Sequence, residues 1–277
     1  MKTRIGLCQI KTVESPEENL RAAERALRLA AESGCRLAVL PEMFCCPYSN
    51  ESFRANAHEA KEGGAVYDFL SGEAKRLGMA IVGGSMPERE GDSIYNSSLI
   101  FDERGRLAGK HRKVHLFDVD IKDGIRFMES ETISAGDSAT VARVAGISVG
   151  VGICYDVRFP LLASVMAEGG AELLAYPGAF NMVTGPAHWE MTLKARALDS
   201  QCFAVGVSPA LNEGLSYRAY GHSMAADPWG RTMLILGYEE NFAAVDIDLE
   251  MLHETRRQLP LLAGARKVGL APTAGGL

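Results

Sequence analysis

The sequence lacks three features that would each assign it to a particular class of protein. No run of apolar residues approaches the roughly 18 that a membrane-spanning helix needs, and the N-terminal residues show no apolar signal core. Positive charge is not in excess either, because the net charge is −6 and the isoelectric point is near 5.6. We therefore expect no membrane span, no secretion signal and no nucleic-acid-binding surface.

Cysteine pairs of the Cys-x-x-Cys type are also missing. The six cysteines are scattered along the 277 residues, at positions 8, 35, 45, 46, 154 and 202. This spacing is typical of reduced thiols and not of a disulfide framework. The sequence therefore predicts a cytoplasmic protein.

The composition that is present is that of an ordinary globular protein. Apolar residues make up 47% and charged residues 23% of the chain, which is enough to bury a sizeable core. We find no linker and no low-complexity segment before residue 262. The residues from 263 to 277 are glycine-rich and lack periodicity. The sequence therefore predicts one domain over 1–262, followed by a C-terminal tail over 263–277.

Helix and strand signals alternate along the chain. A helix is expected to begin at Ser15, because Pro16 follows at the first helical position and Glu18 completes a capping box, and to end at Gly34. The other expected helices cover 66–77, 160–167, 188–200 and 249–259, and 44–56 is expected to be a loop. The expected strands cover 4–10, 37–40, 79–86, 96–102, 106–110, 147–154, 173–177, 203–208, 223–226, 232–236 and 243–247. Two similar strand–helix halves and a hairpin over 96–110 predict an α/β fold of two mixed sheets between helix layers.

The segment 146–160 organises the rest of the chain. By the period-2 rule, one face of its strand is apolar and the other face is nearly bare of side chains. The first face carries Ile147, Val149, Val151 and Ile153, and the second carries Ser148, Gly150, Gly152 and Cys154. Alternating glycines indicate that something packs close to the backbone. Cys154 itself stands at the carboxyl end of the strand, where α/β proteins gather ligands, and is either a nucleophile or a buried structural cysteine.

Two further residues could assist a thiol at that place. Glu42 follows Pro41 at the end of the 37–40 strand, and its apolar neighbours would raise its pKa toward that of a general base. Its alternative is an exposed loop carboxylate. Lys113 lies in the basic cluster 110–113, which is either a solvated face or the source of one inward-pointing cation. An inward ammonium would favour a thiolate and could hold the oxygen of a tetrahedral intermediate.

Taken together, three motifs resemble those of the nitrilase superfamily of carbon–nitrogen hydrolases. The motifs are Pro-Glu-Met-Phe around Glu42, His-Arg-Lys-Val-His-Leu-Phe around Lys113, and Gly-Ile-Cys-Tyr-Asp-Val-Arg-Phe-Pro around Cys154. The likeness covers about residues 3–262, in the right order. It implies a Glu–Lys–Cys triad and a single-domain α-β-β-α sandwich.

Within the superfamily the chain is most similar to the ω-amidase branch, in the segments 115–120, 127–130, 176–181 and 184–190. This resemblance implies a cysteine-dependent amidase that hydrolyses the amide of a small carboxylate-bearing substrate, such as α-ketoglutaramate or succinamate. The reaction would pass through a thioester and release ammonia. The resemblance also implies that no metal or organic cofactor is needed, and it implies a homodimer or a higher homo-oligomer.

The same resemblance implies the roles of further residues. Glu129 matches a second glutamate that would orient Lys113 and help to protonate the leaving ammonia, although an ordinary surface glutamate is its alternative. The backbone N–H of Tyr155 would join Lys113 in holding the oxyanion. Other expected substrate-binding residues are Tyr48, Phe180 and Arg158. For Arg158 two readings stay open: a partner for the substrate carboxylate, or a structural arginine that holds the turn.

Some segments depart from the ω-amidase pattern. Residues 53–58 read Phe-Arg-Ala-Asn-Ala-His, where ω-amidases usually carry Phe-Pro-x-Tyr-Ala-Glu, and 197–202 and 221–224 resemble the deaminated glutathione amidase branch. The alternatives are therefore a deaminated glutathione amidase or an N-carbamoyl hydrolase on the same scaffold. An alternative of another class is a non-catalytic small-molecule binding protein.

Three other motifs do not support a function by themselves. A Gly-x-Ser-x-Gly pattern over 146–150 places its serine in mid-strand, away from the elbow that a serine hydrolase requires. His111 and His115 have the spacing of zinc ligands on a helix, but neither a helix nor a third ligand is expected there. Asn96 begins an Asn-Ser-Ser glycosylation pattern, which has no meaning in a cytoplasmic chain.

Overall fold

The computed structural model describes residues 2–122 and 125–265. In the described part of the chain one sheet has seven strands, in the order β15-β1-β2-β3-β5-β4 with β6 paired to β5. These strands are β1 (Lys2–Gln9), β2 (Leu37–Val39), β3 (Ala80–Val82), β4 (Met86–Glu90), β5 (Ser93–Phe101), β6 (Leu107–Arg112) and β15 (Asn241–Asp248). β1, β2 and β3 are parallel and the other pairings are antiparallel, so the sheet is mixed.

The second sheet has six described strands, in the order β14-β13-β12-β11-β10-β9. They are β9 (Thr140–Val144), β10 (Ile147–Val151), β11 (Leu173–Pro177), β12 (Phe203–Val207), β13 (Met224–Ala226) and β14 (Thr232–Ile235). β10, β11 and β12 are parallel and the outer strands are antiparallel. A separate two-stranded hairpin consists of β7 (Asp118–Asp120) and β8 (Arg126–Met128).

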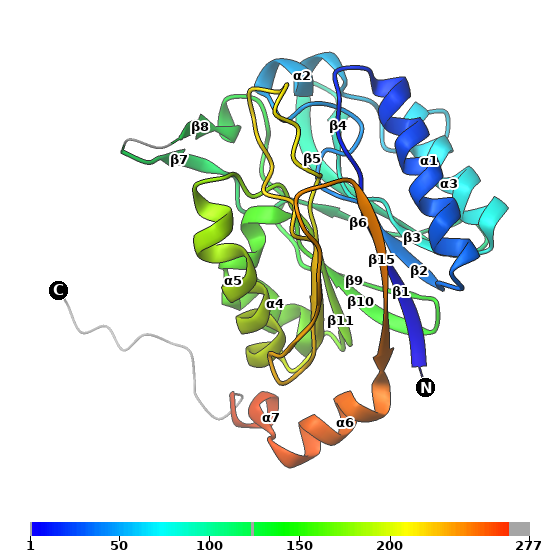
Figure 1. Cartoon of the computed structure of the whole chain (residues 1–277), viewed down its shortest axis with the longest axis vertical. Helices are drawn as coiled ribbons and strands as arrows, with labels where there is room; N and C mark the ends of the chain where they lie inside the picture. The colour runs from blue at the N-terminus through cyan, green and yellow to red at the C-terminus, as the bar shows by residue number, and fades with distance from the viewer. Residues whose placement is uncertain (1, 123–124, 266–277) are drawn as a thin grey trace.

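Helices cover the outer faces of both sheets, and the sheets face each other between them (Figure 1). α1 (Pro16–Glu32) and α3 (Ala65–Leu77) pack on the first sheet, and α4 (Pro160–Glu168) and α5 (Thr184–Ser200) pack on the second. The remaining helical segments are α2 (Asn50–Ala55), α6 (Leu249–Gln258), α7 (Leu261–Ala265) and the 3-10 turns η1 (Glu129–Glu131) and η2 (Cys154–Arg158). The predicted α-β-β-α sandwich is confirmed.

The alternating sequence of β10 determines which layer packs against each of its two faces. Val149 and Val151 belong to the apolar core between the sheets, together with Ile5 of the facing sheet. The bare face lies against the helix layer and the side chains of β11: a Cβ on Gly150 would come within 3.1 Å of Met166 in α4, and one on Gly152 within 2.8 Å of the Tyr176 ring in β11. The predicted close packing against these glycines is confirmed.

Several predicted boundaries were wrong, and a local polar contact or turn explains three of them. The expected loop 44–56 contains α2, whose N-cap Ser49 accepts a hydrogen bond from the N–H of Ser52. α5 begins at Thr184 and not at His188, because the Asn181 side chain accepts hydrogen bonds from the N–H groups of Val183 and Thr184. The expected strand 79–86 breaks after Val82, where Gly84 adopts φ +54 and a Cβ would meet the Pro41 carbonyl oxygen.

The C-terminal region is described only in part. The predicted helix over 249–259 corresponds to α6, and α7 follows directly after Pro260. Residues 266–277 of the predicted tail lie outside the described residues. None of the described helices is both long and apolar enough to cross a membrane.

Candidate active site

Cys154 lies on a sharp turn after β10. The strand ends at Val151, earlier than predicted, and Cys154 begins the 3-10 turn η2 with a left-handed φ of 47°. For a non-glycine residue this backbone conformation costs about 1–3 kcal/mol, so the surroundings must enforce it. The side chain is 3% exposed. The structure thus places a buried thiol on the strained turn that the sequence indicated.

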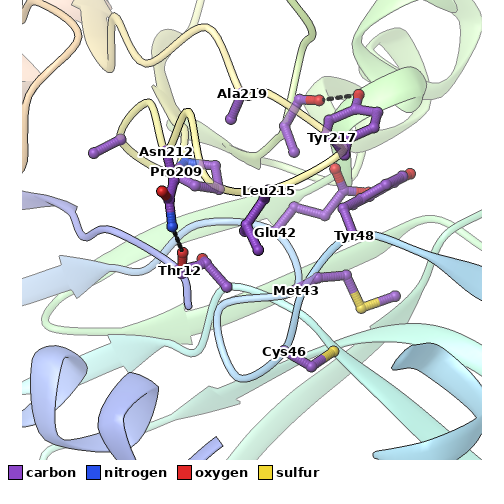
Figure 2. A pocket seen from close by; sticks show the side chains of 12 residues that line it. Thr12, Glu42, Met43, Cys46, Tyr48, Pro209, Asn212, Leu215, Tyr217 and Ala219 are labelled. Carbon is purple, nitrogen blue, oxygen red and sulfur yellow. Dashed lines mark hydrogen bonds between the residues drawn. The ribbon is translucent and has the colours of Figure 1, made fainter. Parts of the chain in front are cut away.

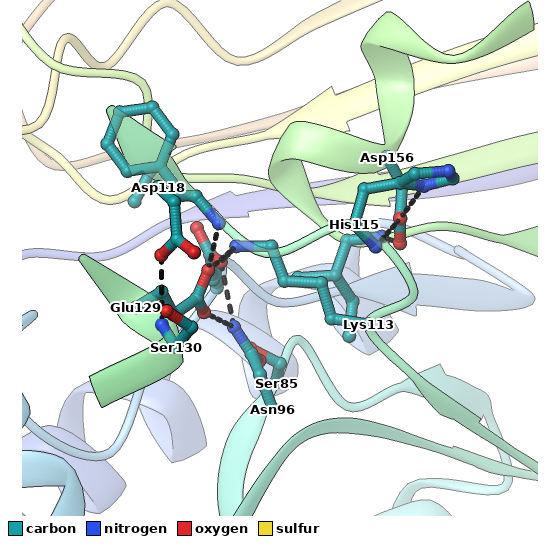
Figure 3. Close-up of polar contacts among 12 residues, drawn as sticks. Ser85, Asn96, Lys113, His115, Asp118, Glu129, Ser130 and Asp156 are labelled. Carbon is teal, nitrogen blue, oxygen red and sulfur yellow. Dashed lines mark hydrogen bonds and ion pairs between the residues drawn. The ribbon is translucent and has the colours of Figure 1, made fainter. Parts of the chain in front are cut away.

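Asp156 holds this turn in place. Its Oδ2 accepts a hydrogen bond of 2.9 Å from the N–H of Ile153, and its Oδ1 accepts one of 2.9 Å from the N–H of His115. The His115 ring lies 2.8 Å from Oδ1 and the His111 ring 3.1 Å from Oδ2 (Figure 3). Burial would raise the pKa of Asp156, but these hydrogen bonds outweigh it and lower the pKa well below its usual range. The zinc-like spacing of the two histidines is therefore explained by a shared carboxylate.

Glu42 lies on the turn after β2, in the facing sheet. The N–H of Met43 donates to Ser85 Oγ at 3.0 Å, which anchors this turn to the loop before β4. The Glu42 side chain is 1% exposed. Its Oε1 accepts hydrogen bonds from Lys113 Nζ at 2.8 Å and from Asn96 Nδ2 at 2.9 Å. Its Oε2 has no hydrogen-bond partner among the described residues.

Lys113 follows β6 directly and is fully buried. Its Nζ lies 2.8 Å from Glu42 Oε1, 2.8 Å from Glu129 Oε2 and 3.4 Å from Tyr48 Oη. The basic cluster 110–113 thus divides: Lys113 points into the site, while Lys110 and Arg112 pair with Glu88 instead. The inward-cation interpretation of the cluster is the one that the geometry supports.

Glu129 is also fully buried, on the 3-10 turn η1. Its Oε2 accepts from Lys113 Nζ and, at 2.7 Å, from the N–H of Phe117, and its Oε1 accepts from Asn96 Nδ2 at 3.0 Å (Figure 3). The alternative of an ordinary surface glutamate is therefore wrong. Two carboxylates and one ammonium form a single buried group.

Burial controls the protonation of this group. It raises the pKa of Glu42, which Lys113 only partly offsets. For Lys113 burial would lower the pKa, but the carboxylates of Glu129 and Glu42 outweigh it and hold the pKa well above its ordinary value. Burial and the Glu42 charge likewise raise the pKa of the Cys154 thiol. The raised pKa of Cys154 favours a neutral thiol, which needs a base to react.

A small cavity borders this group. Glu42, Tyr48 and Tyr217 gather on one side of it and Thr12 and Asn212 on the other (Figure 2). The Tyr217 hydroxyl donates to the Ala179 carbonyl oxygen at 2.5 Å, and its ring lies 4.5 Å from that of Tyr48. The carboxylate of Glu42 is thus enclosed by aromatic side chains.

Arg158 lies on the same turn as Cys154 and has an unusual environment. Its guanidinium is 4.6 Å from the Phe180 ring centroid and 5.6 Å from that of Tyr155. Its Nη1 lies 3.1 Å from His188 Nδ1, and its Nε is buried without a hydrogen-bond partner among the described residues. Burial lowers the pKa of Arg158, and Cys154 is among the groups whose charge it senses. No carboxylate of the described chain neutralises this cation.

Sequence reasoning missed Asn96, Asp156 and Tyr217. Asn96 was considered only as part of a glycosylation pattern, although an amide on a buried strand face is itself a signal of a polar partner. Asp156 stood inside a recognised motif without an assigned role. Tyr217 lies in an irregular loop, where no periodicity points to it.

Comparison with known proteins agrees with this arrangement. The sequence profile of the Carbon-nitrogen hydrolase family matches residues 4–257. The chain belongs to this family. It is 45% identical over 260 residues to "Omega-amidase NIT2-B" of Xenopus laevis, covering 94% of both chains. It is 44% identical over 263 residues to "Omega-amidase, chloroplastic" of Arabidopsis thaliana, covering 94% of this chain and 71% of that protein.

A solved structure extends the likeness to the fold. Nit3 of Saccharomyces cerevisiae, described as a member of branch 10 of the nitrilase superfamily, superimposes with a TM-score of 0.87 at 39% identity. The match covers 94% of this chain and 95% of that chain. The resemblance to the nitrilase superfamily that the three motifs indicated is confirmed.

The role of Asp156 predicts a pH-dependent loss of stability in the variant Asp156→Asn. Because the folded-state pKa of Asp156 lies below the unfolded value of about 3.9, its carboxylate stabilises the protein above that pH and ceases to do so as the pH falls further. At pH 7 the variant should lose about 1–3 kcal/mol in the free energy of unfolding by urea. The difference from wild type should shrink below about pH 4.

Asp246→Asn is the matched control. Asp246 also has a lowered pKa, caused by Arg4, but the pair is exposed. Its loss should therefore cost less than about 1 kcal/mol. Equal losses in the two variants, or a difference for Asp156→Asn that persists unchanged to pH 3, would contradict the proposed role of Asp156 in holding the turn.

Proposed function

We propose that this protein is a cysteine-dependent ω-amidase. It hydrolyses the terminal amide of a small monoamide of a dicarboxylic acid, such as succinamate or α-ketoglutaramate, and releases ammonia. The observation that carries the proposal is the buried group of Glu42, Lys113 and Glu129 facing the thiol of Cys154. Relatives described as omega-amidases at 44–45% identity support the choice of substrate class.

In the first step the thiol of Cys154 attacks the amide carbon while Glu42 takes the thiol proton. A new C–S bond forms and the carbonyl π electrons move onto oxygen. The ammonium of Lys113 and the N–H of Tyr155, which lies in the first turn of a helical segment, stabilise that oxyanion. Removal of one such donor typically costs about 2.7–4 kcal/mol of barrier.

In the second step the tetrahedral intermediate expels ammonia. The proton on Glu42 passes to the leaving nitrogen, with Glu129 orienting Lys113 beside it, and the C–N bond breaks to leave a thioester on Cys154. Glu42 then takes a proton from water as the water oxygen attacks the thioester. The second tetrahedral intermediate then collapses: the C–S bond breaks, the proton returns from Glu42 to sulfur, and the carboxylic acid leaves. Every proton in this sequence comes from the thiol or from water, so the proposed steps need no cofactor.

Arg158 supplies the recognition of the second carboxylate. It is half-buried, stacked near Phe180 and Tyr155, and without an anionic partner in the described chain. A partly desolvated cation of this kind is stabilised by an incoming anion. An ω-amide places a carboxylate a few bonds from the scissile amide, which matches an arginine on the same turn as the nucleophile.

Two further proposals concern location and assembly. Six buried cysteines, none of them in a disulfide within the described residues, support a reducing cytoplasmic location, although one relative is described as chloroplastic. For assembly we propose a homodimer formed through α4 and α5. These two helices pack together and expose apolar residues that point outward, namely Leu161, Val165, Val183, Met191 and Leu198.

The reaction is tested by ammonia release from a substrate panel. The panel contains succinamate, α-ketoglutaramate, deaminated glutathione, N-carbamoyl-β-alanine and a simple nitrile. Wild type should turn over the first two, and Cys154→Ala should be inactive while remaining folded. Cys35→Ala, a buried cysteine elsewhere, should retain activity. If only deaminated glutathione or the carbamoyl substrate is turned over, the protein belongs to another branch of the superfamily. If no compound of the panel releases ammonia, a non-catalytic binding role is favoured.

The role of Arg158 is tested with a pair of substrates that differ only in charge. Arg158→Met should lower kcat/KM for succinamate by at least about 100-fold, because the substrate carboxylate loses its buried partner. For butyramide, which carries a methyl group in that place, the change should stay within a few-fold. Arg256→Met, which removes a part-buried arginine bonded to backbone carbonyls elsewhere, should change neither. Equal losses on both substrates would mean that Arg158 only holds the turn.

The dimer is tested by light scattering after size-exclusion chromatography. Wild type should have twice the chain mass of 29.8 kDa. Leu161→Asp combined with Met191→Asp should give monomers, because these side chains are 66% and 62% exposed in the single chain and become buried in the dimer. Leu29→Asp, at a 45% exposed apolar position on α1, should remain dimeric. A monomeric wild type would refute the proposed interface.

A further inference from the structure

Asn96 occupies a central place in the buried group although no step of the reaction uses it. It lies on β5 with a fully buried side chain. Its Nδ2 donates one hydrogen bond to Glu42 Oε1, at 2.9 Å, and one to Glu129 Oε1, at 3.0 Å (Figure 3). Its backbone carbonyl oxygen accepts the N–H of Lys113 at 2.8 Å. One residue therefore contacts all three charged members of the group.

The donors that reach each carboxylate are few. Lys113 and Asn96 each provide one hydrogen bond to each glutamate, and Glu129 accepts one more from the N–H of Phe117. The group carries two negative charges and one positive charge on fully or almost fully buried side chains, so each further donor to a carboxylate favours its ionised form. An amide suits this role because it donates two hydrogen bonds from one nitrogen and does not titrate.

The buried amide of Asn96 is unfavourable for stability, which indicates that its two N–H donors are needed by the glutamates. Its Oδ1 is buried and has no hydrogen-bond partner among the described residues. A buried carbonyl oxygen without a partner is unfavourable, and an apolar side chain would avoid it. The two hydrogen bonds that Nδ2 donates to the glutamates offset this unfavourable burial.

The hydrogen bonds also distinguish the two oxygens of Glu42. Oε1 accepts from both Lys113 and Asn96, so both of its lone pairs are engaged. Oε2 has no hydrogen-bond partner among the described residues. A proton that reaches Glu42 therefore binds at Oε2.

We propose that Asn96 is a positioning residue that keeps Glu42 ionised in the resting enzyme and directs the thiol proton to Oε2. The inference rests on the proposed cysteine amidase mechanism. In the first step the S–H bond of Cys154 breaks, its proton binds Glu42 Oε2, and the sulfur lone pair forms the bond to the amide carbon. Asn96 touches no reacting atom and acts only through Glu42 and Glu129.

Other groups that influence Glu42 must be kept constant in the test. The titratable side chains that face it come from several elements: Lys113 after β6, Glu129 on η1, Cys154 on η2, Tyr48 before α2 and Tyr217 in the loop before β13. A substitution at Asn96 retains all five side chains, although Glu129 loses the hydrogen bond from the amide together with Glu42. Any change in the titration of Glu42 is then attributable to the lost amide donors.

The test is the pH dependence of kcat/KM for succinamate in Asn96→Leu. Leucine has a similar volume and no donor, so the carboxylate of Glu42 loses a hydrogen bond that favours its charged form. The acidic limb of the profile should move to higher pH by about one unit, which is a tenfold loss of activity on the acidic side. Asn96→Asp, which offers at most one donor and adds a carboxyl group, should shift the limb in the same direction, and it serves if the leucine variant does not fold.

Ser98→Ala is the matched control. Ser98 lies two residues further on the same strand, is fully buried and has no hydrogen-bond partner for its Oγ among the described residues. Its removal should leave the acidic limb in place. A shift in this control, or a lower rate with an unshifted limb in both Asn96 variants, would reduce Asn96 to a packing role and overturn the proposal.

A second readout does not depend on the substrate. The rate of Cys154 alkylation by iodoacetamide, followed against pH by intact mass, reports the ionisation of the thiol and Glu42 together. Its acidic limb should move upward in Asn96→Leu as the activity limb does. If every amide in the panel proved unreactive, this shift would still support the role of Asn96, whereas an unshifted alkylation limb would refute it.

Discussion

The structure of this site depends on one buried ammonium group. Lys113 has no access to solvent, and two carboxylates at 2.8 Å replace the water that it has lost. Removal of the ammonium would leave two buried carboxylates without a counter-charge, which is strongly unfavourable. Three segments must therefore meet at one point: the turn after β2, the end of β6 and the 3-10 turn η1. The conformation of each one depends on the other two.

A third carboxylate, that of Asp156, positions the turn that carries the Cys154 thiol. Asp156 binds two backbone N–H groups and two imidazole rings, and so fixes the left-handed turn on which Cys154 stands. The same contacts tie η2 to the segment that carries Lys113, since His111 and His115 flank it on both sides. Polar contacts of one buried carboxylate therefore fix the backbone on which the thiol stands.

For Lys113 the sequence left a solvated face and an inward cation open, and only the resemblance to the nitrilase superfamily implied a place beside the thiol. Sequence reasoning did predict the sandwich, most of the strands along the chain, and the places of Glu42 and Cys154 at strand ends. These predictions succeeded because periodicity and strand ends depend on local sequence. The failures share a cause as well. The start of α5 depends on the Asn181 side chain and the break after Val82 on a close approach of Gly84 to Pro41, which are contacts that a linear pattern does not reveal. Asn96 was overlooked because its partners lie 54 and 33 residues away.

The two sheets contribute different halves of the reaction centre. Glu42 follows β2 of one sheet and Cys154 follows β10 of the other, so the distance between the proposed base and the proposed nucleophile depends on the spacing that the apolar side chains between the sheets maintain. Residues such as Val39 and Val149, which lie in that layer, act as a molecular spacer. Their summed volume sets the alignment of proton donor and acceptor across the sandwich. A change of one methylene in this layer therefore alters the reaction rate as well as the melting temperature.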